Sequence, residues 1–297
     1  NMSDNTGSKS EEDTSVSAVS ERTENSISRI GSSNAETDDD KDFKEGLKTT
    51  GLFGGVQIFK ILVSIINSKF IAVLLGPVGM GIMGLLSSTT GIIGNIANMG
   101  LGTSAVRDVS EAYAENKKYK FNRVVSVFRR LVWFTGIFGM AICFFGSPFW
   151  SKITFGNYDY TWAFIVLSVT LLLAQISSGQ GVVLQGTRSF KYLAKSGIIG
   201  SVFGLFTGIP LYFWLGIKGI VPAMMLSSIT VLCLTYHYSH KIKIEKIPLT
   251  WKETFSEGNI MLRLGFFLAL QGFLSTFCAY LVRIYISNTG SVADVGL

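Results

Sequence analysis

Cationic side chains inside apolar runs are the residues of this sequence best suited to chemistry. Lys60 lies near the middle of the run from Thr49 to Leu75, and Lys69 lies nearer its end. Arg283 lies near the end of the run from Ile260 to Ser287. Ionisable groups at bilayer depth are costly and mark substrate or ion pathways. Since lysine and arginine bind phosphate oxygens by charge-assisted hydrogen bonds, these positions favour an anionic substrate.

Helical spacing predicts what surrounds each cation. At 100° per residue, Gln57, Lys60, Ser64 and Asn67 share one helix face, which gives Lys60 a polar stripe at mid-depth. Lys69 points to the opposite side, where snorkelling to the interface and substrate binding are both open. Arg283 tops a face of small residues, a groove that suits either substrate or helix packing; those residues are Gly265, Gly272, Ser275, Thr276 and Ala279.

A second polar face is expected on the run from Ile82 to Val106. Its members recur every three or four residues and should face other helices or a water-filled cavity; they are Ser87, Gly91, Gly94, Asn98 and Gly102. Asn95, Asn98 and Gln57 are candidates for hydrogen bonds to sugar hydroxyls. Interhelical hydrogen bonds are the alternative for each.

Carboxylates, by contrast, avoid the apolar runs. Every Asp and Glu after residue 42 lies at the end of an expected helix or in a loop. Proton- or sodium-coupled antiporters commonly carry the coupling charge on an acid inside the bilayer. The pattern therefore disfavours a cation carrier.

The composition predicts that these residues are held by membrane helices. The chain has 297 residues, of which 48% are apolar and 15% charged, and its mean hydropathy is +0.40, whereas soluble domains have about 25% charged residues. Seven runs approach the roughly 20 residues that cross a bilayer, and they predict an all-α polytopic membrane protein. Besides the three runs above, they are Leu131 to Trp150, Trp162 to Leu184, Gly197 to Leu215 and Ile220 to Tyr238.

Loop charges predict the orientation. The segments Arg107 to Arg130, Arg188 to Lys195 and Lys241 to Lys252 are rich in Lys and Arg, and the alternate loops are poor in them. By the positive-inside rule, the protein is expected in the inner membrane with its basic loops and its N-terminus on the cytoplasmic side. Because the same rule accounts for the basic residues, nucleic-acid binding is not expected. The three cysteines lie singly inside apolar runs, and the two histidines lie one helical turn apart. This pattern predicts no metal site and no disulfide bond, and no cofactor is expected.

Four segments are expected along the chain. Residues 1–42, with eleven acids and four bases, are predicted to be a disordered cytoplasmic tail. Residues 43–240 are predicted to form a six-helix lobe, 241–259 a cytoplasmic linker, and 260–297 the truncated first helix of a second lobe. The chain is thus expected to be the N-terminal part of a transporter of 12 or more helices. Within it, Gly200, Gly204 and Gly208 predict a close helix contact.

Four stretches resemble the Wzx-type flippases of lipid-linked oligosaccharides, which belong to the multidrug/oligosaccharidyl-lipid/polysaccharide exporter superfamily. They are FKILVSIINSKFIAVLLGPVGMGIMG from Phe59, FGNYDY from Phe155, LQGTRSFKYLAKSGIIGSVFG from Leu184 and YLVRIYISNTGSVADVGL at the end. The resemblance implies two six-helix lobes around a central cavity. It also implies that Lys60, Lys69, Arg188 and Arg283 stand at positions that are basic in relatives.

Together these features predict a flippase, not an enzyme, that moves an undecaprenyl-pyrophosphate-linked oligosaccharide such as an O-antigen unit across the membrane by alternating access. Expected partners are this anionic lipid, the bilayer, and polysaccharide polymerase and chain-length proteins. A multidrug antiporter of the same superfamily is one alternative, but it would require acids in the cavity. A membrane polymerase or ligase is another, although the longest outer loop, Ser151 to Thr161, is short for catalytic residues.

Overall fold

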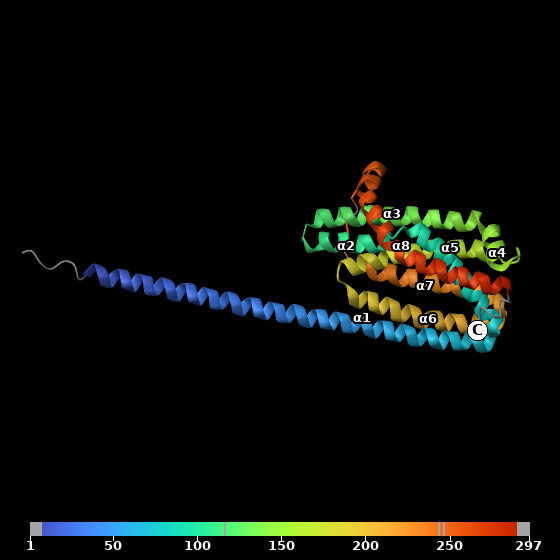
Figure 1. Ribbon diagram of the computed structural model, residues 1–297, viewed down its shortest axis with the longest axis horizontal. Coiled ribbons are helices and arrows are strands. Elements are labelled where there is room, and N and C mark those ends of the chain that lie inside the picture. The colour runs from blue at the N-terminus through green and yellow to red at the C-terminus, as the bar shows by residue number, and fades with distance from the viewer. Residues whose placement is uncertain (1–7, 116, 243, 246, 290–297) are drawn as a thin grey trace, which may run out of the picture. The chain divides into compact units, whose positions relative to one another are not determined.

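The computed structural model describes residues 8–115, 117–242, 244–245 and 247–289, and within these ranges all regular structure is helical. Its elements are α1 (Ser8–Asn98), α2 (Leu101–Ala114), α3 (Lys118–Phe145), α4 (Ser147–Phe155), α5 (Thr161–Gly186), α6 (Phe190–Leu215), the short 3₁₀ helix η1 (Gly216–Gly219), α7 (Ile220–Ser239) and α8 (Trp251–Thr289) (Figure 1). The predicted all-α class is confirmed.

Four stretches of the described residues are long and apolar enough to cross a membrane: 54–98, 118–145, 161–186 and 190–239. The first has 45 residues and the last 50, about twice the length that a bilayer requires. Each is interrupted, at Gly76 in α1 and at η1 between α6 and α7, so each supplies two spans. Together with the shorter apolar stretch Phe273–Ile286 of α8, they place a helix on every predicted span.

Exposed side chains support a lipid environment. Val73, Phe145 and Trp214 expose 82%, 81% and 77% of their surface. Exposing such large apolar side chains to water is unfavourable, whereas contact with lipid tails is not. The chain is therefore a polytopic membrane protein.

The tail differs from its prediction. α1 includes residues 8–42, for which composition predicted disorder. No proline occurs between residues 8 and 54, so nothing in the sequence blocks helical backbone there. Residues 1–54 and 55–297 form two separate units.

A sharp turn divides the membrane part of α1 into two helices. Gly76 has φ 66° and ψ −171°, a conformation open essentially to glycine alone, and Pro77 follows it. Because proline has no backbone N–H, it cannot continue the hydrogen-bond ladder, and the chain turns back in Figure 1.

The predicted span from Ile82 to Val106 is wrong as a single helix. It breaks after Asn98, where Met99 and Gly100 both have positive φ, and α2 begins at Leu101. Gly265 of α8 packs here: a Cβ added to Gly265 would lie 2.7 Å from the carbonyl carbon and oxygen of Gly100. The break therefore allows two backbones to meet.

The predicted loop from Arg107 to Arg130 is also wrong, because most of it is helical. α3 begins at Lys118, and Phe121, Val125 and Phe128 bury one face. At the short turn before it, a 2.5 Å hydrogen bond from Lys120 to Glu115 holds the pKa of that carboxyl below its usual value. At the other end, the single span predicted to reach Trp150 is broken at Gly146, and α4 follows with a proline in its first turn.

Small residues let the helices approach closely. A Cβ added to Gly200 of α6 would lie 3.1 Å from Val231 of α7, and one added to Gly204 would lie 3.1 Å from Ser227. The predicted close contact is therefore confirmed for these two glycines. Gly208 instead faces Tyr212 of its own helix. On α5, Gly179 contacts Val132 of α3 in the same way.

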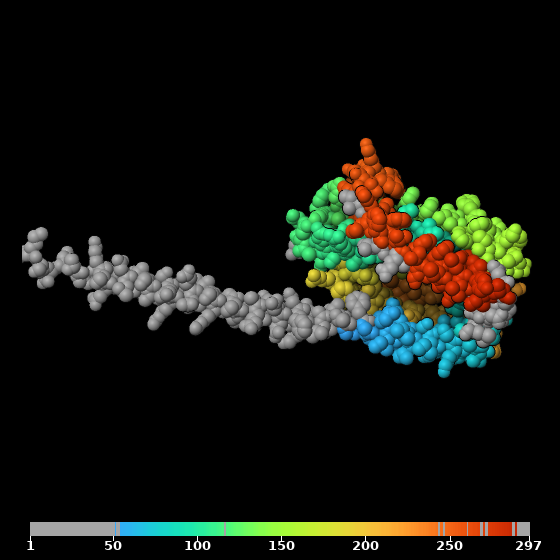
Figure 2. All heavy atoms as spheres, viewed as in Figure 1, coloured from blue at the N-terminus to red at the C-terminus, as the bar shows by residue number. Residues whose placement is uncertain are grey.

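α8 is attached to the bundle along its length. Near its start, inside the segment predicted as a linker, Glu257 forms a 2.6 Å ion pair with Arg123 of α3. Arg130 of α3 donates a 2.5 Å hydrogen bond to the carbonyl of Leu249, just before α8, and a 3.3 Å hydrogen bond to the hydroxyl of Thr254 within it. Figure 2 shows a hollow between α8 (red) and the first membrane helix of α1 (blue), with α6 and α7 (yellow to orange) behind it.

Candidate functional site

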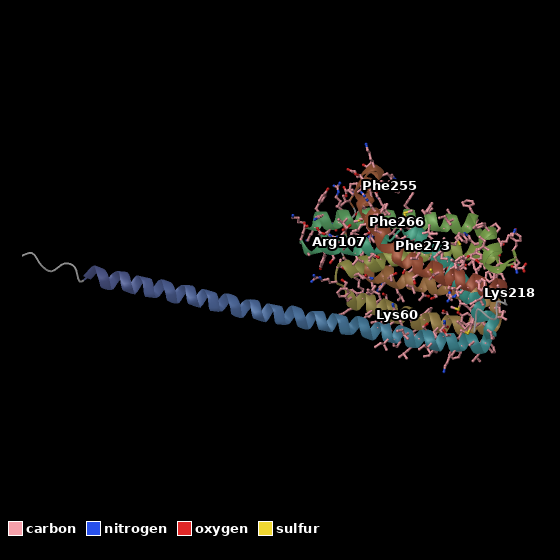
Figure 3. The ribbon with its side chains drawn as sticks, viewed as in Figure 1. Lys60, Arg107, Lys218, Phe255, Phe266 and Phe273 are labelled. Carbon is pink, nitrogen blue, oxygen red and sulfur yellow. The ribbon has the colours of Figure 1, made fainter. Side chains whose placement is uncertain are left out.

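The first membrane helix of α1 holds Lys60 against a glycine of α6. A Cβ added to Gly197 would lie 2.7 Å from Cε and 2.9 Å from Nζ of Lys60. A side chain at this position would require the end of Lys60 to move from where it lies. Lys60, labelled in Figure 3, is exposed and lines a groove of about 380 Å³ among α1, α5, α6 and α7.

Polar side chains line the same groove. Ser64 and Asn67 come from α1, and the other helices add hydroxyls; these are Thr170 of α5, Ser201 of α6, and Ser227 and Ser228 of α7. Ser201 donates a 2.8 Å hydrogen bond to the carbonyl of Gly197, and Thr170 bonds the carbonyl of Val166 at 3.4 Å. Because their protons are used within the helices, both hydroxyl oxygens remain acceptors for ligand hydroxyls.

The groove carries one positive charge. Among its described lining residues Lys60 is ionisable at neutral pH, and none is Asp or Glu. A cation among neutral hydroxyls suits a ligand with an anionic group and several hydroxyl groups. Its described lining residues include no paired carboxylate and histidine of the kind that general acid–base catalysis uses.

Three of the four residues predicted to share the face of Lys60 line this groove, namely Lys60, Ser64 and Asn67. Gln57 is exposed and lies outside the lining set, as does Lys69, which is also exposed. The structure thus separates the two lysines of this helix, and only Lys60 belongs to the site.

Arg283 occupies a different place. Its Nη1 donates a 3.1 Å hydrogen bond to the carbonyl of Gly84 and another to the hydroxyl of Ser88, both on the second membrane helix of α1. The guanidinium therefore fastens α8 to α1. Of the two alternatives for this residue, the structure favours helix packing.

The two asparagines also lie in helix contacts. Asn95 donates a 3.2 Å hydrogen bond to Thr276 of α8. Asn98 accepts a 3.0 Å hydrogen bond from Gln175 of α5, which donates to Thr135 of α3 as well. Both are engaged between helices, as the alternative to sugar binding anticipated.

A family model supplies the comparison that decides the affiliation of the chain. The model for polysaccharide biosynthesis protein matches residues 47–297, which include every helix described from α2 onward and the membrane part of α1. The chain belongs to this family. Searches of curated proteins and of solved structures return no match.

In this polysaccharide biosynthesis protein, Arg188 lies apart from the groove. It stands in the turn between α5 and α6 with φ 53°, its side chain is exposed, and its backbone N–H bonds the carbonyl of Gln185 at 2.9 Å. Within the described part of the chain, no group of three or more His, Cys, Asp or Glu residues is placed to hold a metal ion.

Sequence reasoning missed a partly buried cation, Arg129 of α3. The expected loop up to Arg130 hid it, whereas α3 carries it between α5 and α7, where it bonds Gln180 and Ser239. The helical spacing of Phe121, Val125 and Phe128 was the signal that could have revealed it.

Proposed function

We propose that this protein is a flippase that moves an undecaprenyl-pyrophosphate-linked oligosaccharide, such as an O-antigen repeat unit, across the inner membrane. The observation that carries the proposal is the placement of Lys60 in a groove lined by hydroxyl groups and free of described carboxylates. Membership of a polysaccharide biosynthesis family supports the same substrate class.

The groove suits the two parts of this substrate differently. A pyrophosphate brought into a low-dielectric interior loses its hydration, and Lys60 would offset that cost by attraction and hydrogen bonding. Ser64, Asn67 and Ser201 would bond sugar hydroxyls. Such neutral contacts are individually weak and tolerate different sugars.

Transport by alternating access makes and breaks no bond, so the protein is proposed to be a carrier rather than an enzyme. The N-terminus and the arginine- and lysine-rich loops would face the cytoplasm. Polymerase and chain-length proteins would receive the oligosaccharide at the outer leaflet. A drug-cation antiporter is less well supported, because a cation would be repelled by Lys60.

Charge reversal of Lys60 tests the proposal. The complete gene is introduced into a flippase-deficient, O-antigen-negative bacterium, and surface polysaccharide is measured on a gel. Lys60→Glu should lower it by at least about 100-fold, because like charges about 4 Å apart repel by about 4 kcal/mol at a partly screened site. Lys69→Glu is the matched control, on the same helix but outside the groove, and should stay within about twofold because exposed charges contribute little.

Normal polysaccharide from inserted Lys60→Glu protein would contradict the role of the groove. If the unchanged gene fails to restore polysaccharide although its product is inserted, the lipid-linked unit of that strain is not the substrate. Drug-efflux assays would then test the antiporter.

A further inference from the structure

A second cavity lies where α3, α5 and α7 meet, and it shares no described lining residue with the Lys60 groove. Its volume is about 240 Å³. Arg129, Gln180, Tyr236 and His240 are its polar lining residues, and the remaining wall is largely apolar. One of these residues, His240, is the C-cap of α7.

The guanidinium of Arg129 has only neutral partners among the described residues. Its Nη2 donates to Oε1 of Gln180 at 3.3 Å and to Oγ of Ser239 at 3.5 Å, and Ser239 donates to the same Gln180 oxygen at 2.7 Å. Its Nε–H is buried and has no hydrogen-bond acceptor. No described carboxylate forms an ion pair with it.

This environment lacks a negative charge. A partly buried guanidinium without a counter-ion is unfavourable, and a buried N–H without an acceptor adds to the cost. Both costs fall if an anion enters the cavity and the side chain turns its N–H groups toward it. The planar fork of guanidinium donors can bind two oxygens of a phosphate or a carboxylate at once, and a phosphate keeps further oxygens free for other donors.

The mouth of the cavity adds further donors. Tyr236 and His240 are exposed and stacked, with ring centroids 5.6 Å apart. A phenol and an imidazole at the entrance can both donate hydrogen bonds to phosphate oxygens. The site is therefore open to a group arriving from the surface of the bundle.

We propose that Arg129, Gln180, Tyr236 and His240 form a binding site for a phosphate group, separate from the transport groove. The phosphate can belong to the headgroup of an anionic phospholipid or to a soluble phosphate. The inference goes beyond the proposed transport, and its test measures binding only.

Binding is measured on the purified complete protein, freed of lipid in detergent. Native mass spectrometry and thermal unfolding follow two probes in parallel, phosphatidylglycerol and inorganic phosphate. A phosphate-free glucosyl diacylglycerol and chloride at equal ionic strength are their controls. Arg129→Gln removes the charge, whereas Gln180→Glu supplies an internal counter-ion and keeps the bond to Arg129. Lys118→Gln, an exposed position at the start of the same helix, is the matched control.

Phosphatidylglycerol, phosphate or both should bind the unchanged protein, and the dissociation constant should rise at least about tenfold in Arg129→Gln and Gln180→Glu, the loss of one charge-assisted contact. Lys118→Gln, which lies outside both cavities, should bind normally. Preference for phosphatidylglycerol identifies a lipid headgroup, and equal competition identifies a general phosphate site. If Arg129→Gln does not fold, the binding measured for Gln180→Glu is the test of the proposal. Binding unaffected by Gln180→Glu, or no binding to the unchanged protein, overturns the proposal.

Discussion

Lys60 and Arg283 are both cations inside apolar helical stretches, yet their surroundings on the two membrane helices of α1 differ. The first helix leaves Lys60 in an open groove, with room provided by Gly197. On the second helix, the carbonyl of Gly84 and the hydroxyl of Ser88 accept hydrogen bonds from Arg283. A charge whose partners belong to the protein holds helices together, whereas a charge facing a polar groove remains available to a ligand.

Replacing each cation by methionine should sharpen this contrast most. Arg283→Met leaves a carbonyl and a hydroxyl without their donor and should lower the free energy of unfolding by about 3 kcal/mol. Lys60→Met should change it by less than about 0.5 kcal/mol, because no hydrogen bond or ion pair to a described residue is lost. Thermal unfolding in detergent measures both, and equal losses would remove the distinction.

The packing around α8 should be the next most sensitive feature. Gly265→Ala would place its methyl group against the backbone of Gly100, which cannot move aside as a side chain can. We expect a loss of about 2 kcal/mol from this overpacking. Gly91→Ala is the matched control, since its Cβ would meet Thr276 at an ordinary 3.8 Å. Similar melting temperatures for the two variants would show that α8 does not pack closely on Gly100.

Crowding Lys60 should affect transport more than stability. In Gly197→Ala the flexible end of the lysine can move away from the new methyl group, so the fold should be kept. The displaced ammonium should lower transport about fivefold, or on the order of 1 kcal/mol. Gly181→Ala, whose Cβ would find 3.8 Å of space beside Leu193, should transport normally. Equal transport by both variants would argue against a positioned Lys60.

The smallest effect is expected at Asn95. Asn95→Ala removes one interhelical hydrogen bond to Thr276, and such bonds contribute about 0.6 kcal/mol in membrane proteins. Transport should be unchanged because the side chain lies in a helix contact. A large transport defect in an Asn95→Ala protein of normal thermal stability would indicate that Asn95 binds substrate.

Helix existence could be predicted from the sequence, because a run of apolar residues in lipid has few other structures open to it. The polar stripe of Lys60, Ser64 and Asn67 could be predicted as well, since helical periodicity fixes which side chains share a face. The interruption at Met99 and Gly100 could not. It depends on a contact with Gly265, which is more than 160 residues away in the sequence.

The separation of Lys60 from Lys69 was only partly predictable. Periodicity placed them on different faces, but the groove itself is built from α5, α6 and α7 and needs the packed structure. Arg129 was missed for another reason. Hydropathy marks where an apolar run begins, whereas α3 begins 13 residues before Leu131, in a more polar segment.

The attachments of α8 have a mechanical consequence. It is fixed near one end by Glu257 and Arg123, and toward the other by Arg283 on α1. A rod held at two distant points cannot tilt independently of the body that holds it. Any conformational change that displaces α3 and the second membrane helix of α1 together therefore carries α8 with them as one rigid piece.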